Sequence, residues 1–170
     1  MDKSNELLTF LKQLGICYDL YRHAPVMTIA DCYAIESLPF DDAEYPKNVF
    51  LSNRQKTDFY LMLLQHDRAF RTSVVSKRLG VSRLSFAPDS LLNGFLNLEA
   101  GAVSPLGLMF DRERRVRLVM DKALERFEYL YFHPCVNTAS VRMRRADFTG
   151  IFLPAIGHDL TIISCDEEEP

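Results

Sequence analysis

The chain has 170 residues, of which 48% are hydrophobic and 25% are charged, and its formal net charge is -3. This balance is typical of one globular domain and excludes disordered and fibrous chains. The slight acidic excess also argues against a protein that binds nucleic acid over a broad basic surface, so such a contact is expected to be local.

The sequence carries no sign of export or membrane insertion. Its N-terminus lacks the continuous apolar run of a signal peptide, and no segment reaches the ~20 apolar residues of a membrane span. The four cysteines are widely separated and form no C-x-x-C pair, which favours reduced thiols over a zinc site or disulfides. We therefore expect a soluble, cytoplasmic protein with a single domain over 1–170 and a frayed acidic tail at 166–170.

The first half of the chain predicts helices and strands in alternation. Leucines at helical spacing predict an amphipathic helix over 5–14, and the pattern at 17–23 predicts a strand. Thr28, followed three residues later by Asp31, resembles a capping box and predicts a short second helix. The apolar runs NVFLSN and DFYLMLLQ predict a β-hairpin within 48–65.

The second half continues this mixture. Helices are predicted over 72–80 and over 90–98, the latter with Asp89 as its N-cap. LGLMF and RVRLVMD flank a charged turn and predict a second hairpin, FEYLYFH and SVRMR predict further strands, and a closing helix is predicted over 145–156. About seven strands and four or five helices in this order predict an α+β domain with a mixed, mostly antiparallel sheet.

Several common catalytic signatures are absent. The sequence has no G-x-G-x-x-G, no G-x-x-x-x-G-K-[ST], no H-E-x-x-H and no G-x-S-x-G, which argues against nucleotide hydrolysis and serine-elbow chemistry. The four histidines are tens of residues apart, so local spacing does not support a metal site. Neither a metal nor another cofactor is expected.

Three segments carry residue types that suit a binding site. Lys47 and Asn48 precede an apolar strand, where a side chain at the strand mouth can point into a pocket. The loop at 101–105, GAVSP, has a glycine that lets the backbone approach a ligand and a proline that fixes the exit direction. In 132–140, FHPCVNTAS, His133 ends a strand and suits acid–base chemistry. Each segment also suits an ordinary role as solvated surface, tight connection or loop contact.

These segments fall in a familiar order. The sequence resembles the prolyl-tRNA editing-domain superfamily, whose free-standing bacterial members are aminoacyl-tRNA deacylases related to the editing insertion of prolyl-tRNA synthetase. The matching segments are HAPVMT (23–28), KNVFL (47–51), RLSFA (83–87), GAVSPLGL (101–108), VMDKAL (119–124), FHPCVNTAS (132–140) and GH (157–158). KN before VFL, GAVSP and HP-x-x-N-T look most like the branch that removes alanine from mischarged tRNA(Pro). MFDRERR departs from the family pattern.

The resemblance implies a curved α+β sheet domain without a metal, and a small pocket for the aminoacyl group and terminal adenosine of a tRNA. The implied reaction is hydrolysis of the aminoacyl ester, with mischarged tRNA(Pro) as substrate and prolyl-tRNA synthetase or an elongation factor as candidate partners. Two alternatives stay open. The protein either removes cysteine or another small residue, or is a non-catalytic tRNA-binding module on the same fold.

Hydrolysis of an activated ester needs a placed water and a stabilised oxyanion rather than a covalent nucleophile, and the family implies help from the neighbouring ribose hydroxyl. Three catalytic residues are therefore predicted: Lys47, Gly101 and His133. The predicted substrate-binding residues are Asn48, Ala102, Val103, Ser104, Pro105, Asn137 and Thr138. Cys135 is expected to pack, because Pro134 interrupts the strand that would align it with His133.

Overall fold

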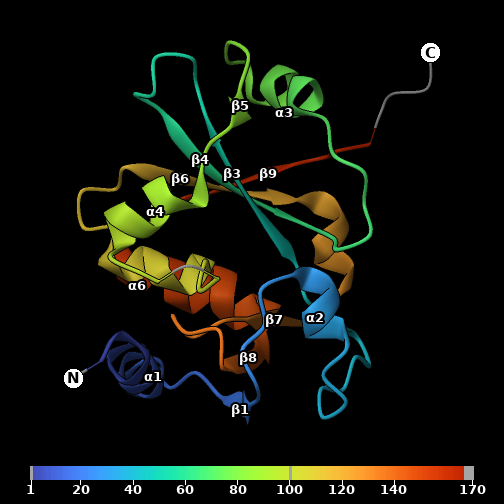
Figure 1. Cartoon of the computed structure of the whole chain (residues 1–170), viewed down its shortest axis with the longest axis vertical. Helices are drawn as coiled ribbons and strands as arrows, with labels where there is room; N and C mark the ends of the chain where they lie inside the picture. Colours follow the sequence, from blue (N-terminus) through green and yellow to red (C-terminus); the bar gives the residue numbers. More distant parts are fainter. Residues whose placement is uncertain (1, 100, 167–170) are drawn as a thin grey trace.

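The computed structural model describes residues 2–99 and 101–166 (Figure 1). Over these residues the chain forms nine β-strands and six α-helices. The strands are β1 (Tyr18–Arg22), β2 (Ala43–Glu44), β3 (Lys47–Ser52), β4 (Phe59–Leu64), β5 (Ser85–Phe86), β6 (Val116–Asp121), β7 (Tyr129–Phe132), β8 (Ala139–Arg144) and β9 (Leu160–Ile163). The α-helices are α1 (Lys3–Gln13), α2 (Ile29–Tyr33), α3 (Thr72–Leu79), α4 (Asp89–Leu96), α5 (Arg145–Asp147) and α6 (Leu153–Ile156). The other helical segments are the 3-10 helices η1 (Pro105–Phe110) and η2 (Lys122–Arg126) and the π-helical turn η3 (Phe148–Phe152).

The strands form two sheets, with orders β1-β8-β7-β2 and β5-β3-β4-β6-β9. Neighbours are antiparallel in β1–β8, β8–β7, β5–β3 and β3–β4, and parallel in β2–β7, β4–β6 and β6–β9. In Figure 1 the five-stranded sheet lies above the four-stranded one, with α4 and α6 beside them. The predicted α+β class with mostly antiparallel strands is confirmed, although the strands are divided between two sheets.

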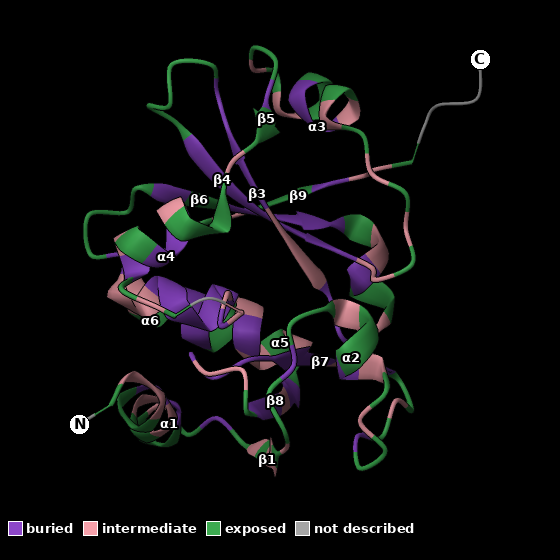
Figure 2. Ribbon diagram, in the orientation of Figure 1, coloured by how far each residue is buried: buried purple, intermediate pink, exposed green. Residues whose placement is uncertain are grey.

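The main core contains side chains from both sheets, and strand β4 contributes to this core from one of its two faces. All six residues of β4 are buried, as Figure 2 shows for the centre of the fold. Successive strand residues point to opposite faces. Leu61 and Leu63 therefore join the main core with residues of β6, β7 and β8, whereas Met62 and Leu64 join a smaller cluster with Val75 of α3. A strand covered on both faces has the continuous apolar sequence seen here.

The predicted buried face of the first helix and the predicted ends of the next two helices are confirmed. Leu7 and Leu11, one turn apart, are fully buried on α1. The capping box of α2 is complete, because Thr28 Oγ1 accepts from the Asp31 amide at 3.1 Å and Asp31 Oδ2 accepts from the Thr28 amide at 3.1 Å. Helix α3 ends at Gly80, whose φ of 66° is left-handed, as expected of a C-terminal glycine.

Two local predictions were wrong. LGLMF forms η1 rather than a strand, because Ser104 caps a helical turn that has Pro105 at its first position. Strand β6 consequently has no hairpin partner and pairs in parallel with β4 and β9. Asp89 is the first residue of α4 rather than its N-cap, which is Pro88. The closing helix is confirmed as the continuous run of α5, η3 and α6.

Within the described residues, no helix is both long and apolar enough to cross a membrane. The predicted frayed tail falls mostly outside those residues, since 167–170 are not described. Its first residue, Asp166, forms an ion pair with Arg68 and is thus held against the fold.

Candidate active site

A cavity of about 160 Å³ opens where the chain crosses from β2 in one sheet to β3 in the other. It is lined by Met27, Thr28, Ile29, Cys32, Tyr45, Pro46, Lys47, Asn48, Asp89, Gly101, Val103 and His133. The start of β3, the 101–105 loop and the end of β7 are far apart in the chain. The fold brings these three predicted segments to one cavity.

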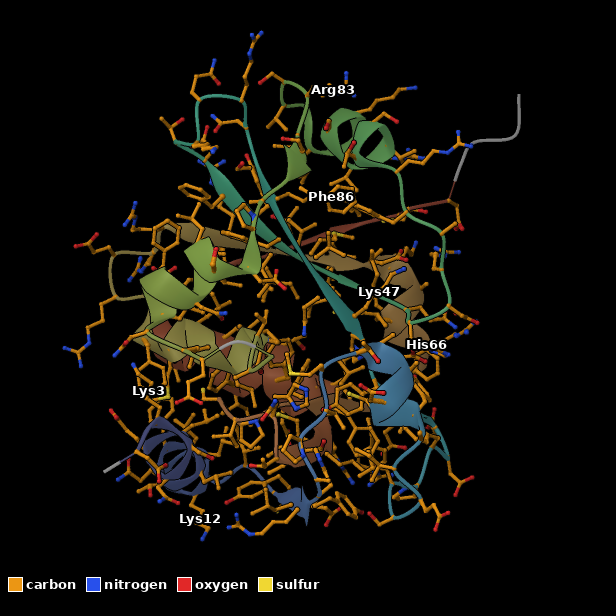
Figure 3. All side chains as sticks on the ribbon, in the orientation of Figure 1. Lys3, Lys12, Lys47, His66, Arg83 and Phe86 are labelled. Atoms are coloured by element: carbon orange, nitrogen blue, oxygen red, sulfur yellow. The ribbon has the colours of Figure 1, made fainter. Side chains whose placement is uncertain are left out.

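Lys47 is the first residue of β3, and its ammonium is tethered at the cavity (Figure 3). Its Nζ donates to the carbonyl of Arg68 at 2.6 Å. The Arg68 guanidinium in turn donates to Asp121 Oδ2 at 3.0 Å, and the Asp121 side chain is fully buried. A partly buried ion pair thus helps to fix the residue whose carbonyl positions Lys47. An ammonium has three protons, so one tether leaves two for a ligand.

Asn48 connects the strand mouth to the glycine loop. Its Nδ2 donates to the Val103 carbonyl at 3.3 Å. Its Oδ1 is buried and has no hydrogen-bond partner in the part of the chain that the structure describes. An unsatisfied buried acceptor costs about 1–3 kcal/mol, so a group that completes it would be stabilised there.

Gly101 occupies a position that glycine alone fills without strain. Its φ is +78°, and a Cβ added there would lie 2.9 Å from Met27 Sδ and 3.2 Å from Asn137 Nδ2. Left-handed backbone is costly for other L-residues. The bare glycine lets this loop close against the wall that Met27 forms.

The amides of the 101–105 loop differ in availability. The Ala102 amide donates to the Glu99 carbonyl at 3.2 Å, and Pro105 has no amide proton. The Val103 and Ser104 amides have no acceptor among the described residues, and Val103 also lines the cavity. The Val103 amide is therefore a candidate backbone donor to a developing oxyanion.

His133 follows β7 and is buried, with 8% of its surface exposed. Its Nδ1 lies 3.0 Å from the Tyr45 hydroxyl and 3.1 Å from the Ala139 carbonyl, while Nε2 lies 4.0 Å from Cys32 Sγ. Burial lowers the pKa of His133, an effect that the Ala139 carbonyl partly opposes. The ring is thus a neutral imidazole at neutral pH.

The nearby thiols are poor nucleophiles. Burial raises the pKa of Cys32 to about 11 and that of Cys135 to about 12, so both are protonated at neutral pH. Cys135 lies in the main core and does not line the cavity, in line with its expected packing role.

Five of the ten predicted site residues line the cavity: Lys47, Asn48, Gly101, Val103 and His133. Ala102, Ser104 and Pro105 are buried in the same loop without lining it. The Asn137 and Thr138 carbonyls accept from the amides of Val26 at 3.1 Å and His23 at 2.9 Å. These two residues therefore hold the segment that leads to the Met27 wall.

Other lining residues were missed by the sequence reasoning. Met27 and Thr28 fall within the matching segment HAPVMT, which is the signal that could have found them. Tyr45, Cys32 and Asp89 carried no such signal, because a buried aromatic, a small thiol and an acid at a helix start all suit ordinary structural roles.

The chain is similar to known proteins over most of its length. Residues 23–151 match the aminoacyl-tRNA editing domain family. The chain is 32% identical over 152 residues to the prolyl-tRNA editing protein ProX of Acetoanaerobium sticklandii, covering 89% of this chain and 91% of that protein. It is also 32% identical over 165 residues to prolyl-tRNA synthetase associated domain-containing protein 1 of Mus musculus, covering 95% of each.

A solved structure whose name refers to a trans-editing enzyme for prolyl tRNA synthetase has the same fold, with a TM-score of 0.68 and 13% identity over 98% of this chain and 99% of that one. The match to the family covers most of the chain, and the ProX relative covers nearly all of it. The resemblance drawn from the sequence is confirmed, and the chain belongs to the aminoacyl-tRNA editing domain family.

Proposed function

We propose that this protein is a trans-editing hydrolase that cleaves the ester of mischarged aminoacyl-tRNA, with Ala-tRNA(Pro) as its substrate. Membership of the editing family and the similarity to ProX support prolyl-tRNA editing by deacylation. The observation that carries the proposal is the single cavity shared by Lys47, Asn48, Gly101, Val103 and His133.

In the proposed reaction, water attacks the ester carbon and the carbonyl oxygen becomes an oxyanion. Collapse of this intermediate breaks the bond to the ribose oxygen, which takes up the proton that the water loses. The Val103 amide and the tethered Lys47 ammonium are the groups that supply positive charge at this oxygen. With both nearby thiols protonated, a covalent thioester is disfavoured and the route depends on a positioned water. The ribose hydroxyl next to the ester helps to place that water.

Size is the proposed basis of selectivity. The cavity, whose lining includes Met27 and Ile29, accepts a methyl side chain, and its walls are proposed to set an upper size limit on the aminoacyl group. Such a site excludes by an upper size limit, because admitting a smaller group loses only about 1–3 kcal/mol per methylene. Cysteine is therefore the competitor that alanine specificity must be measured against.

The tRNA body is expected to add modest affinity of its own. A protein with a net charge of -3 neutralises few phosphates overall, so binding should be weak and should depend only modestly on salt concentration. We propose that prolyl-tRNA synthetase or an elongation factor delivers the mischarged tRNA. Neither partner changes the chemistry proposed for the cavity.

The test is single-turnover deacylation of Ala-, Cys- and Ser-tRNA(Pro) by the same purified protein. Fastest release of alanine is expected. Faster release of cysteine or serine would show that the protein removes that amino acid rather than alanine. Binding of all three without release of any amino acid would identify a non-catalytic tRNA-binding module and overturn the hydrolase proposal.

A further inference from the structure

A chain of hydrogen-bonded side chains leads from the cavity into the four-stranded sheet. His133 Nδ1 lies 3.0 Å from the Tyr45 hydroxyl, which lies 2.9 Å from Ser140 Oγ. Ser140 Oγ lies 2.8 Å from Nε2 of His23. Tyr45, Ser140 and His133 are all buried, so these groups depend on one another for hydrogen bonds.

A backbone carbonyl stands at each end of this chain. The Ala139 carbonyl lies 3.1 Å from His133 Nδ1, and the Ala24 carbonyl lies 2.8 Å from His23 Nδ1. A carbonyl oxygen has no proton and only accepts. Both contacts are hydrogen bonds only if each histidine carries its proton on Nδ1.

The two carbonyls therefore set the direction of every bond between them. His133 Nδ1–H donates to Ala139 and to Tyr45, the Tyr45 hydroxyl donates to Ser140, and the Ser140 hydroxyl donates to His23 Nε2. The reverse direction would put an imidazole lone pair against each carbonyl oxygen at 2.8 Å and 3.1 Å. Two such repulsive contacts, of which the one at His133 is buried, disfavour it.

The consequence appears at the far side of the His133 ring. With the proton on Nδ1, Nε2 keeps a lone pair, and its neighbour at 4.0 Å is the thiol of Cys32, another cavity residue. A protonated thiol is a weak donor. A hydroxyl or ammonium donor of the substrate can replace it at Nε2 with a stronger hydrogen bond.

We propose that Ser140 and His23 are positioning residues that keep the Tyr45 hydroxyl proton turned away from His133. The Ala139 carbonyl then holds His133 as the Nδ1–H tautomer, so that Nε2 meets the substrate as a hydrogen-bond acceptor. The inference deepens the proposed function and rests on it for the identity of the substrate. Burial, which lowers the pKa of His133, acts in the same direction by keeping the ring neutral.

Nitrogen-15 NMR of the imidazole rings in the full-length protein tests the network without any substrate, because it distinguishes a protonated from an unprotonated ring nitrogen. The unmodified protein is expected to show Nδ1–H for both His133 and His23. Ser140→Ala removes the acceptor of the Tyr45 hydroxyl, which can then turn its proton toward His133 Nδ1. This variant should show a mixture of His133 tautomers and about tenfold slower single-turnover deacylation.

Two tyrosine variants sharpen the result. Tyr45→Phe leaves the Ala139 carbonyl in place, so His133 should stay Nδ1–H. Tyr131→Phe is the matched control, since Tyr131 is a buried tyrosine stacked on Tyr45 whose hydroxyl donates to Pro39 instead. It should leave both the His133 tautomer and turnover unchanged.

An Nε2–H signal for His133 in the unmodified protein would overturn the proposal. So would Ser140→Ala with an unchanged tautomer, or a changed tautomer with unchanged turnover. If the unmodified protein releases no amino acid from any tRNA, the proposed function fails, while the NMR result still decides whether the network exists.

Discussion

Gly101→Ala separates backbone strain from a contact at the cavity. Gly101 has φ +78°, and left-handed backbone costs an L-residue about 1–2 kcal/mol. For a chain of 170 residues, each kcal/mol lowers Tm by about 2–4 °C, so a loss of roughly 2–8 °C is expected. The new Cβ would also lie 2.9 Å from Met27 Sδ. Met27 is 63% exposed, so it can move at little further cost in stability, but it then no longer forms the same cavity wall.

Gly80→Ala is the matched control. Its φ is +66°, and a Cβ there would have nothing within 4 Å. Thermal melts should therefore show similar losses for the two variants, whereas single-turnover deacylation should fall at least tenfold (~1.4 kcal/mol) only in Gly101→Ala. Equal turnover in the two variants would remove Gly101 from the mechanism. A much larger loss of Tm in Gly101→Ala would show that Met27 does not move away from the added Cβ.

Three further predictions concern side chains of the site and its surroundings. Lys47→Met should reduce the single-turnover rate by roughly 10²–10³-fold, as loss of one oxyanion-stabilising group does. Lys12→Met on α1, far from Lys47 in Figure 3, is the control and should keep the unmodified rate. Similar rates in the two variants would refute the role of the Lys47 ammonium. Cys135→Ala should keep its turnover rate, since a thiol with a pKa of about 12 is not the nucleophile; complete loss in a folded variant would contradict this. Because burial lowers the pKa of His133, the unfolded state, with a pKa of about 6.5, binds more protons below that pH. The stability contribution of a neutral His133 is thus fully present above about pH 6.5 and is lost as pH falls toward the folded pKa. His133→Gln should flatten the fall in the free energy of unfolding between about pH 7 and pH 5, measured by urea titration, and an unchanged slope would show that His133 does not titrate differently on folding.

The fold was most predictable where local chemistry decides it. The hairpin of β3 and β4 and the capping box at Thr28 follow from neighbouring residues and are present. The second hairpin was wrong because a short apolar run such as LGLMF suits a strand or a helical turn equally well. Strand β9 pairs with β6 from far along the chain, and such parallel pairing leaves no local trace in the sequence.

The site divides in the same way. Lys47 and Gly101 could be predicted because a lysine before an apolar strand and a glycine in a turn lie within segments that match the family. Both line the cavity. Tyr45 was missed because its role depends on a hydrogen bond to His133, which is 88 residues away in the chain. Ser140 was missed for the same reason, as its partners come from two other strands or loops.

Editing requires that the enzyme spare the correct product, so the central measurement compares Ala-tRNA(Pro) with Pro-tRNA(Pro). Both are incubated with the same purified protein, and kcat/KM is determined for release of each amino acid. We expect efficient release of alanine and negligible release of proline, because an editing site must leave the correctly charged tRNA intact. Equal release of both, or release of neither, would contradict the account.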